Sequence, residues 1–236
     1  MSTATAWPVI GGNMKILIIG CSNSLYLHHD FNKVFNIHPA HIVNLSAPGV
    51  GNRYITARLF EYVNNNKLPD YVYLQYSGLS RIDIPLDRKV VVPNYDYQTK
   101  TATANWVASG GQNGSWRNCE MLKRFFAYMY PIAETQNKDI YSMSLNEIFS
   151  GIQLCNTLGV KYNWSTYYDY TNPPNELTKI DGFVEKIPDY IDYSNHINEY
   201  PLNLAYTLNR IPEDGIHYGR SVGEAYLERN RNKFNI

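Results

Sequence analysis

The sequence predicts an α/β domain in which a mostly parallel sheet lies between two layers of helices. Residues 16–19 are an unbroken apolar run, Ile-Leu-Ile-Ile, which is typical of a strand buried on both faces of a parallel sheet. The run ends in Gly20-Cys21-Ser22, a turn of small residues at the place where open α/β sheets carry their ligand sites. After this turn, helix-like and strand-like segments alternate at a spacing that implies right-handed crossovers between parallel strands.

The alternation is clearest in the first third of the chain. Apolar residues at helical spacing predict helices over 23–35 and 53–65. Short apolar runs predict strands over 41–45 and 71–76. Residues 46–52, rich in turn-forming types, connect the second strand to the second helix. These segments together predict a parallel sheet with right-handed crossovers.

The segment from about 82 to 117 interrupts the alternation with prolines and a Gly-Gly-Gln-Asn-Gly tract. Long irregular segments in compact domains are usually functional, so we expect an inserted cap loop over the carboxyl edge of the sheet. Helical spacing resumes over 118–135. A further helix is expected to begin at Ser144, which forms a capping box with Glu147, and to end at Gly159.

The last part of the chain has one clear strand and one clear helix. Residues 160–164 predict a fourth strand, and residues 220–231 predict a final helix. Residues 167–212 are polar and rich in Pro and Tyr, and their pattern assigns no element. We expect a single domain over 14–236, preceded by a short extension over 1–13.

Composition argues against several classes of function. The chain has 21 Lys and Arg against 21 Asp and Glu, so it offers no electrostatic basis for binding nucleic acid or an anionic membrane. No apolar run reaches the length of a membrane span, and residues 1–13 lack the features of a secretory signal. We therefore expect a cytoplasmic or virion-associated protein.

Neither a metal nor a cofactor is expected. The three cysteines are scattered and fit neither a disulfide framework nor a zinc motif. His28 and His29 are neighbours on a predicted helix, and we expect their rings to point apart, which would prevent chelation of one ion.

Ser22 is the candidate nucleophile. It would project from the start of the helix after the first strand, where a hydroxyl is either an N-cap or a nucleophile. Ser24 is a competing hydroxyl, which we expect to face into the helix. Asp214 and His217 lie three residues apart in a tight turn before the last helix, so the carboxylate can orient the imidazole. Such a pair is what a weak hydroxyl nucleophile needs, and it favours catalysis over a capping role.

Three motifs occur in one order along the chain. They are Gly20-x-Ser22 after the first strand, Asn44-x-x-x-x-Gly49 after the second, and Asp214-x-x-His217 before the last helix. In this order they resemble the SGNH (GDSL-like) hydrolases, and the resemblance covers nearly the whole chain. The Gly-Cys-Ser start and the Gln75-Tyr76-Ser77 end of the third strand are most similar to members from bacteriophage and marine bacterial genomes. The resemblance implies a flavodoxin-like fold and cleavage or transfer of acyl groups.

The resemblance also implies roles for single residues. Ser22 would be the nucleophile, His217 its general base, and Asp214 the carboxylate that orients His217. The backbone N–H groups of Ser22 and Gly49 would donate to the oxyanion.

One feature of the family is missing. Its Asn side chain after the third strand, a further oxyanion donor, is absent from Tyr76-Ser77-Gly78. The hydroxyl of Ser77 or the amide of Asn52 would take its place. Arg81 would bind an anionic group of the substrate, with a structural ion pair as the alternative.

The expected substrate is a small acyl ester, such as an O-acetyl group on a polysaccharide, hydrolysed through an acyl-enzyme. Two alternatives stay open. One is a non-catalytic module that binds glycan or protein through a degenerate site, and the other is an acyltransferase. The expected partner is a small-molecule or glycan ester, and assembly into an oligomer or a virion is compatible with the sequence but not required by it.

Overall fold

The computed structural model describes residues 14–85, 106–108, 124, 138–211, 213, 215, 217–234 and 236. The predicted extension over 1–13, most of the cap and the helix expected over 118–135 lie outside the described residues, as does Asp214. No helix in the part of the chain that the structure describes has the length and apolar character needed to cross a membrane.

A parallel sheet of four strands forms the centre of the molecule. Its strands are β1 (Ile16–Gly20), β2 (Ile42–Asn44), β3 (Tyr71–Tyr76) and β6 (Lys161–Thr166), in the order β2-β1-β3-β6. All neighbouring pairs are parallel, as predicted. The chain therefore starts in the middle of the sheet and crosses over between strands.

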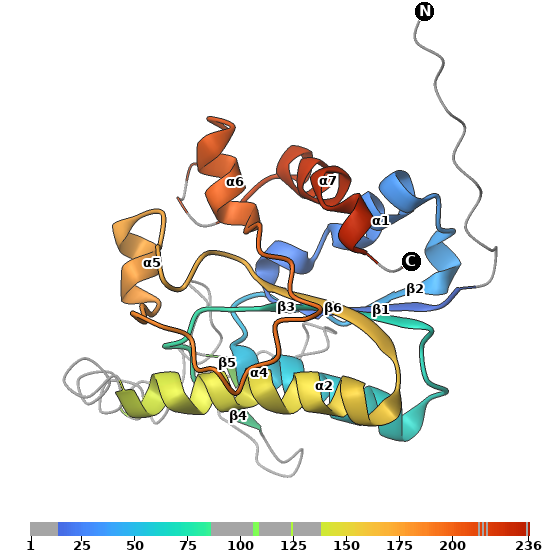
Figure 1. Ribbon diagram of the computed structural model, residues 1–236, viewed down its shortest axis with the longest axis horizontal. Helices are drawn as coiled ribbons and strands as arrows, with labels where there is room; N and C mark the ends of the chain where they lie inside the picture. The colour runs from blue at the N-terminus through green and yellow to red at the C-terminus, as the bar shows by residue number, and fades with distance from the viewer. Residues whose placement is uncertain are drawn as a thin grey trace, which may run out of the picture.

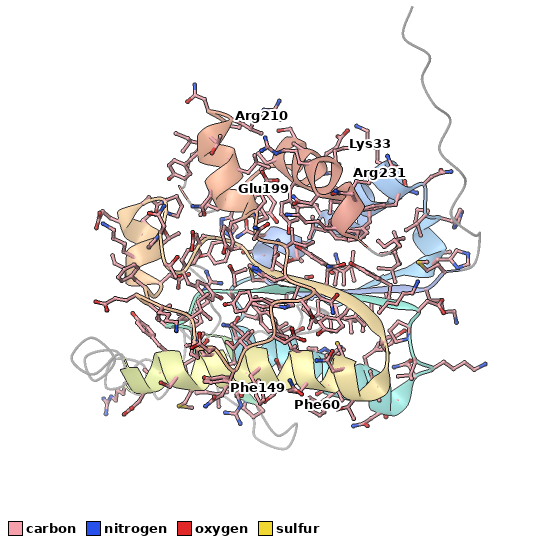
Figure 2. The ribbon with its side chains drawn as sticks, in the orientation of Figure 1. Lys33, Phe60, Phe149, Glu199, Arg210 and Arg231 are labelled. Atoms are coloured by element: carbon pink, nitrogen blue, oxygen red, sulfur yellow. The ribbon has the colours of Figure 1, made fainter. Side chains whose placement is uncertain are left out.

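Helices cover both faces of this sheet (Figure 1). One layer contains α1 (Leu27–Phe35), α6 (Pro201–Thr207) and α7 (Arg220–Arg229), and the other contains α2 (Asn52–Asn65) and α4 (Lys138–Leu158). Figure 2 shows Phe60 and Phe149 on the α2 and α4 layer, with Lys33 and Arg231 on the opposite layer. The predicted three-layer α/β fold is confirmed.

Strand β1 shows why the sheet is buried on both sides. Ile16 and Ile18 belong to the core beneath α1 and α7, whereas Leu17 and Ile19 belong to the core beneath α2 and α4. This division follows from the two-residue period of a strand. Each of these side chains is fully buried and contributes about 1.5–3 kcal/mol through removal of apolar surface from water.

The start of α4 differs from the prediction. The helix begins at Lys138, so Ser144 lies inside it and does not cap it. The Ser144 hydroxyl accepts a hydrogen bond from Asn52 Nδ2 at 2.7 Å, which gives this polar group a tertiary partner. The predicted end at Gly159 is confirmed, because this residue has a φ of +63°.

The first helix is also divided differently. A 3₁₀ turn, η1 (Ser22–Ser24), follows β1 directly, and the regular helix α1 begins only at Leu27. Two further 3₁₀ turns are η2 (Pro39–His41) before β2 and η4 (Arg231–Lys233) after α7.

No helix or strand was predicted for residues 82–117 and 167–212, but the described parts of both segments contain such elements. Within 82–117, the described residues form β4 (Asp83–Pro85) and β5 (Trp106–Ala108), which pair antiparallel. Within 167–212, the chain forms α5 (Glu176–Ile180) before α6. Helix α5 lies near the carboxyl edge of the sheet (Figure 1).

Candidate active site

Two residues from opposite ends of the chain meet at the carboxyl edge of the sheet. Ser22 Oγ lies 2.7 Å from His217 Nε2, within hydrogen-bonding distance. Ser22 is partly buried in η1, and His217 is exposed in the loop before α7. The arrangement places an imidazole nitrogen where it can accept the proton of the serine hydroxyl.

A buried glutamine connects the two segments that carry this pair. Gln75 Oε1, near the end of β3, accepts from Ser24 Oγ at 2.6 Å and from Tyr218 OH at 3.1 Å. Ser24 follows Ser22 by two positions, and Tyr218 follows His217 directly. Burial holds the pKa of the Tyr218 phenol well above its ordinary value, so the phenol stays a donor. Gln75 therefore holds the serine turn and the histidine loop to the same point of the sheet.

This contact also decides the role of Ser24. Its hydroxyl donates to Gln75 Oε1, so its proton is already engaged and it does not compete with Ser22 as the nucleophile. A Cβ atom at Gly20 would overlap the Ser24 side chain, which explains why a glycine ends β1.

Asn44, from the second motif, joins the serine turn to the loop after β2. Its Nδ2 donates to the carbonyls of Ser24 at 3.0 Å and Leu25 at 3.1 Å, and its Oδ1 accepts from Ser46 N at 2.9 Å. The same loop is attached to β1, because Ala47 N donates to Gly20 O at 3.0 Å. Asn44 thereby sets the position of the loop that leads to Gly49.

Gly49 has a φ of +72°, a left-handed conformation that favours glycine. Within the described part of the chain, neither the Ser22 amide nor the Gly49 amide donates a hydrogen bond to another protein group. Both N–H groups are thus available to a ligand, as an oxyanion hole requires.

Asp83 holds the loop on the other side of Gly49. Its buried carboxylate accepts from Gly51 N at 2.8 Å and from Tyr54 N at 2.9 Å, at the N-terminus of α2. Burial raises the pKa of Asp83 to about 6, while these backbone donors act in the opposite direction.

The two candidates for the missing oxyanion donor differ in availability. Both side chains are fully buried, so they differ only in hydrogen bonding. Asn52 Nδ2 donates to Ser144 Oγ at 2.7 Å, and its Oδ1 accepts from Ser77 N at 2.7 Å. The Ser77 hydroxyl is buried and has no hydrogen-bond partner among the described residues. Register places Gly20 opposite Gln75, so Ser22 and Ser77 each follow this pair by two residues on adjacent strands. We therefore keep Ser77 and not Asn52 as the candidate.

Arg81 makes the structural ion pair that was the alternative to substrate binding. Its guanidinium lies 3.2 Å from Asp181 Oδ2 and donates to Val50 O at 3.2 Å. Both contacts attach the segment after β3 to its surroundings, and the Arg81 side chain is almost entirely buried.

Asn175 holds the histidine loop from a second side. Its Nδ2 donates to Gly215 O at 2.8 Å and to Tyr206 OH at 2.6 Å, and its Oδ1 caps α5 by accepting from Thr178 N at 2.8 Å. Gly215 precedes His217 by two positions and has a φ of +69°. Asp214, the predicted orienting carboxylate, lies outside the described residues, so its role stays a prediction.

The expectation for the histidine pair on α1 is wrong. The ring centroids of His28 and His29 lie 3.8 Å apart with an interplanar angle of 40°, so the rings lie against each other and do not diverge. Burial lowers the pKa of His28, and the neighbouring His29 contributes in the same direction. Among the described residues, no group of three or more potential ligands is arranged for a metal.

The residues that motif reasoning missed are Gln75, Tyr218 and Asn175. Gln75 could have been found from the sequence, because it is a polar residue inside the otherwise apolar and aromatic strand β3. A buried amide needs hydrogen-bond partners, which would have to come from neighbouring segments. No comparable signal existed for Asn175, whose partners are 31 and 40 positions away in the chain.

No family model and no curated protein matches the sequence. Among solved structures, the chain is similar to a mutant of Axe2, an acetyl-xylooligosaccharide esterase from "Geobacillus Stearmophilus". The identity is 14%, with 96% of each chain covered and a TM-score of 0.47.

A second similar structure is the C-terminal catalytic domain of peptidoglycan O-acetyltransferase A from Streptococcus pneumoniae, with a methylsulfonyl adduct. The identity is again 14%, with 94% of this chain and 91% of that chain covered and a TM-score of 0.40. Because both scores lie below 0.5, the fold assignment above rests on strand order and register.

Proposed function

We propose that this protein is a serine esterase of the SGNH type that hydrolyses small acyl esters. The single observation that carries the proposal is the 2.7 Å separation between Ser22 Oγ and His217 Nε2, which joins residues 195 positions apart. An N-cap serine needs no imidazole, so a simple capping role leaves this contact unexplained. The order of the three sequence motifs supports the same function.

In the proposed first step, Ser22 Oγ attacks the carbonyl carbon of the ester while His217 Nε2 accepts the hydroxyl proton. The negative charge then develops on the carbonyl oxygen. The amides of Ser22 and Gly49, and the Ser77 hydroxyl, are the proposed donors to this oxygen. Collapse of the intermediate breaks the bond to the alcohol, which leaves with the proton from His217.

In the proposed second step, water attacks the acyl group on Ser22. His217 accepts a proton from the water, and the acyl–oxygen bond to Ser22 breaks with return of that proton to Oγ. The products are a carboxylic acid and an alcohol. Asp214 is proposed to orient His217 throughout and to stabilise its protonated form.

An O-acetyl group on a sugar is the proposed natural ester, as the resemblance to the SGNH hydrolases implies. Transfer to a second sugar in place of water would use the same acyl-enzyme, and an added acceptor that diverts the acyl group would reveal it.

The first prediction concerns Ser22. A fluorophosphonate probe should add one adduct to the wild-type chain and none to Ser22→Ala, as measured by intact mass. Hydrolysis of an aryl acetate should fall by about 10³-fold or more in the variant, because the nucleophile is lost.

Ser221→Ala is the matched control, because Ser221 is an exposed serine at the start of α7. This variant should be labelled like the wild type. Labelling that persists in Ser22→Ala would remove Ser22 from the chemistry. A wild-type chain that is neither labelled nor hydrolytic, yet binds glycan, would instead be a non-catalytic module.

A further inference from the structure

One cation close in sequence to His217 differs from its neighbours on the same layer of the molecule. Lys33 pairs with Glu224 at 2.6 Å, and Arg229 pairs with Glu199 at 2.8 Å. Arg220, the first residue of α7, has no carboxylate at ion-pair distance in the described part of the chain. Its guanidinium carbon lies instead 5.1 Å from the ring centroid of Tyr26.

Other labelled cations of this layer in Figure 2 also have polar acceptors. Arg210 Nη1 donates to Ser221 O at 3.0 Å, and Arg231 Nη1 lies 3.8 Å from Glu228 Oε2. Among the described residues, Arg220 thus contacts an aromatic face and no carboxylate, and an aromatic face does not use the N–H donors with which a guanidinium binds a planar anion.

Both members of the pair are exposed and close in sequence to the proposed catalytic residues. Tyr26 is 54% exposed, and Arg220 is exposed at the surface. Arg220 follows His217 by three positions, and Tyr26 follows Ser22 by four. At about 3.8 Å between consecutive Cα atoms, the Arg220 Cα lies at most about 11 Å from that of His217. An arginine side chain at this position can reach a group on a substrate bound to Ser22.

The chemistry of the pair indicates what it would recognise. A guanidinium binds a carboxylate through two parallel hydrogen bonds, and the ring beneath it limits the orientations that the guanidinium adopts. A neutral ester has no group that would use these donors as well as a carboxylate does. The same pair provides an exposed aromatic surface beside the carboxylate position.

We infer that Tyr26 and Arg220 form a specificity site for substrates that carry a carboxylate near the ester bond, an inference that rests on the proposed esterase function. Arg220 binds the carboxylate, and Tyr26 holds the guanidinium in place. This assigns to Arg220 the anion-binding role that the sequence suggested for Arg81. The carboxylate belongs either to the alcohol part, as in an esterified acidic sugar, or to the acyl part, as in a dicarboxylic half-ester.

A structural alternative exists and can be separated experimentally. Arg220 and Lys33 both lower the pKa of Asp30, a buried carboxyl on α1 that burial and Glu224 raise to about 6. If Arg220 served only to offset the charge of Asp30, its loss would change stability without changing the preference between substrates.

The test compares esters that differ only in charge. For the alcohol side, the pair is 4-acetoxybenzoate and its methyl ester. For the acyl side, the pair is the mono-4-nitrophenyl ester of succinic acid and the corresponding methyl 4-nitrophenyl diester. The measured quantity is the ratio of kcat/KM for the anionic ester to kcat/KM for its neutral counterpart, so intrinsic reactivity cancels between variants.

Arg220→Gln should lower this ratio about tenfold for one of the two pairs, which identifies the side that carries the carboxylate, because a hydrogen-bonded charge contributes on this scale. Tyr26→Leu should lower the same ratio about threefold, because the support of the guanidinium is lost. Arg229→Gln removes the same charge from the far end of α7 and should leave the ratio unchanged. Hydrolysis of the neutral esters should stay within about twofold in Arg229→Gln, which lies outside the proposed site.

If the wild-type enzyme hydrolysed both members of each pair and Arg220→Gln left both ratios unchanged, this inference would be overturned. The proposed esterase function would still stand. An equal fall in Arg229→Gln would overturn the inference as well, since net charge alone would then explain the effect. The effect of Arg220→Gln on the ratio should persist when Asp30 is also replaced by Asn. If the ratio in the double variant returned to the wild-type value, the role of Arg220 would be to offset the charge of Asp30. A chain that hydrolyses none of the esters and escapes the fluorophosphonate probe would overturn the function and, with it, the inference.

Discussion

Gln75 shows how one buried side chain determines the geometry of the candidate site. Its Oε1 receives hydrogen bonds from both the serine turn and the histidine loop, which are otherwise distant in sequence. The distance between Ser22 and His217 thus depends on a residue that takes no part in the proposed chemistry. Loss of either hydrogen bond should allow the two segments to move relative to each other, and misplacement by about 1 Å can cost up to about 10²-fold in rate.

Tyr218→Phe tests this connection. The variant removes the hydroxyl that donates to Gln75, so we expect kcat for an aryl acetate to fall about three- to tenfold and stability to fall by about 1 kcal/mol. The measurements are steady-state kinetics and urea unfolding.

Tyr226→Phe is the matched control, because it removes an equally buried hydroxyl that bonds to Tyr73 OH at 3.0 Å in the same core. It should cost a similar stability and leave kcat unchanged. Equal losses of kcat in both variants would show that general loosening of the core, and not the contact with Gln75, limits turnover.

Helix α5 has only five residues, too few to be stable alone, yet it contributes to the candidate site. Its N-cap, Asn175, uses one oxygen for the helix and its amide hydrogens for Gly215 and Tyr206. The element is therefore held by the same side chain that positions the histidine loop. Its local capping and its tertiary role can be separated by substitution.

Asn175→Asp keeps the oxygen that caps α5 and removes the two donated hydrogen bonds. We expect kcat to fall about three- to tenfold, since the loop before His217 loses an anchor and the carboxylate repels the Gly215 carbonyl. Thr178→Ala removes the other half of the capping box and leaves the contact with Gly215 in place.

Thr178→Ala should therefore lose about 0.5–1 kcal/mol of stability with little change in kcat. The checks are thermal unfolding and kinetics on both variants. A greater loss of turnover in Thr178→Ala than in Asn175→Asp would place the effect in the helix and not in its link to the loop.

At the scale of the whole molecule, the packing of α1 against α7 introduces a pH dependence of stability. Asp30 lies where these helices meet, and a Cβ atom at Gly223 would overlap its carboxylate. Burial and Glu224 raise the pKa of Asp30 to about 6, against the opposing charges of Arg220 and Lys33. The folded state therefore holds a proton on Asp30 between about pH 4 and pH 6 that the unfolded state has released.

The sign of the effect follows from this difference. Stability from this group is greatest below about pH 4 and falls as the pH rises to about 6, where the folded carboxyl also ionises. Asp30→Asn should remove this fall and make the protein about 1–2 kcal/mol more stable than the wild type at about pH 7.5. Urea unfolding of both proteins between about pH 4 and pH 8 measures the free energy of unfolding as a function of pH. An Asp30→Asn variant that is less stable than the wild type at about pH 8 would contradict the prediction.

Most of the sheet was predictable from the sequence, because a strand that is buried on both faces has to be apolar along its whole length. The apolar run before Gly20 therefore identified β1, and the alternation of strand and helix segments identified the parallel orientation of the strands. The chemistry-bearing loops were predictable for a related reason. The carboxyl ends of parallel strands share one edge, which placed Ser22 there. The meeting of Ser22 with His217 followed from the resemblance to the SGNH hydrolases, because the loop of His217 follows no predicted strand.

Short elements and long-range partners were not predictable from local patterns. Helices α5 and α6 have five and seven residues, so tertiary contacts and not their own periodicity maintain them. The start of α4 was misplaced because Ser144 matched a local capping rule, whereas its hydroxyl bonds across to Asn52.

The sequence by itself determined that the strand at 16–19 is buried on both faces and which residue types stand at the carboxyl edge of the sheet, since burial and side-chain period are local properties of the chain. Only the tertiary structure decided the partners of the polar side chains. Arg81 is paired with Asp181, Ser24 is bound to Gln75, and the Arg220 guanidinium lies over the ring of Tyr26, because each outcome depends on a group contributed by a distant segment.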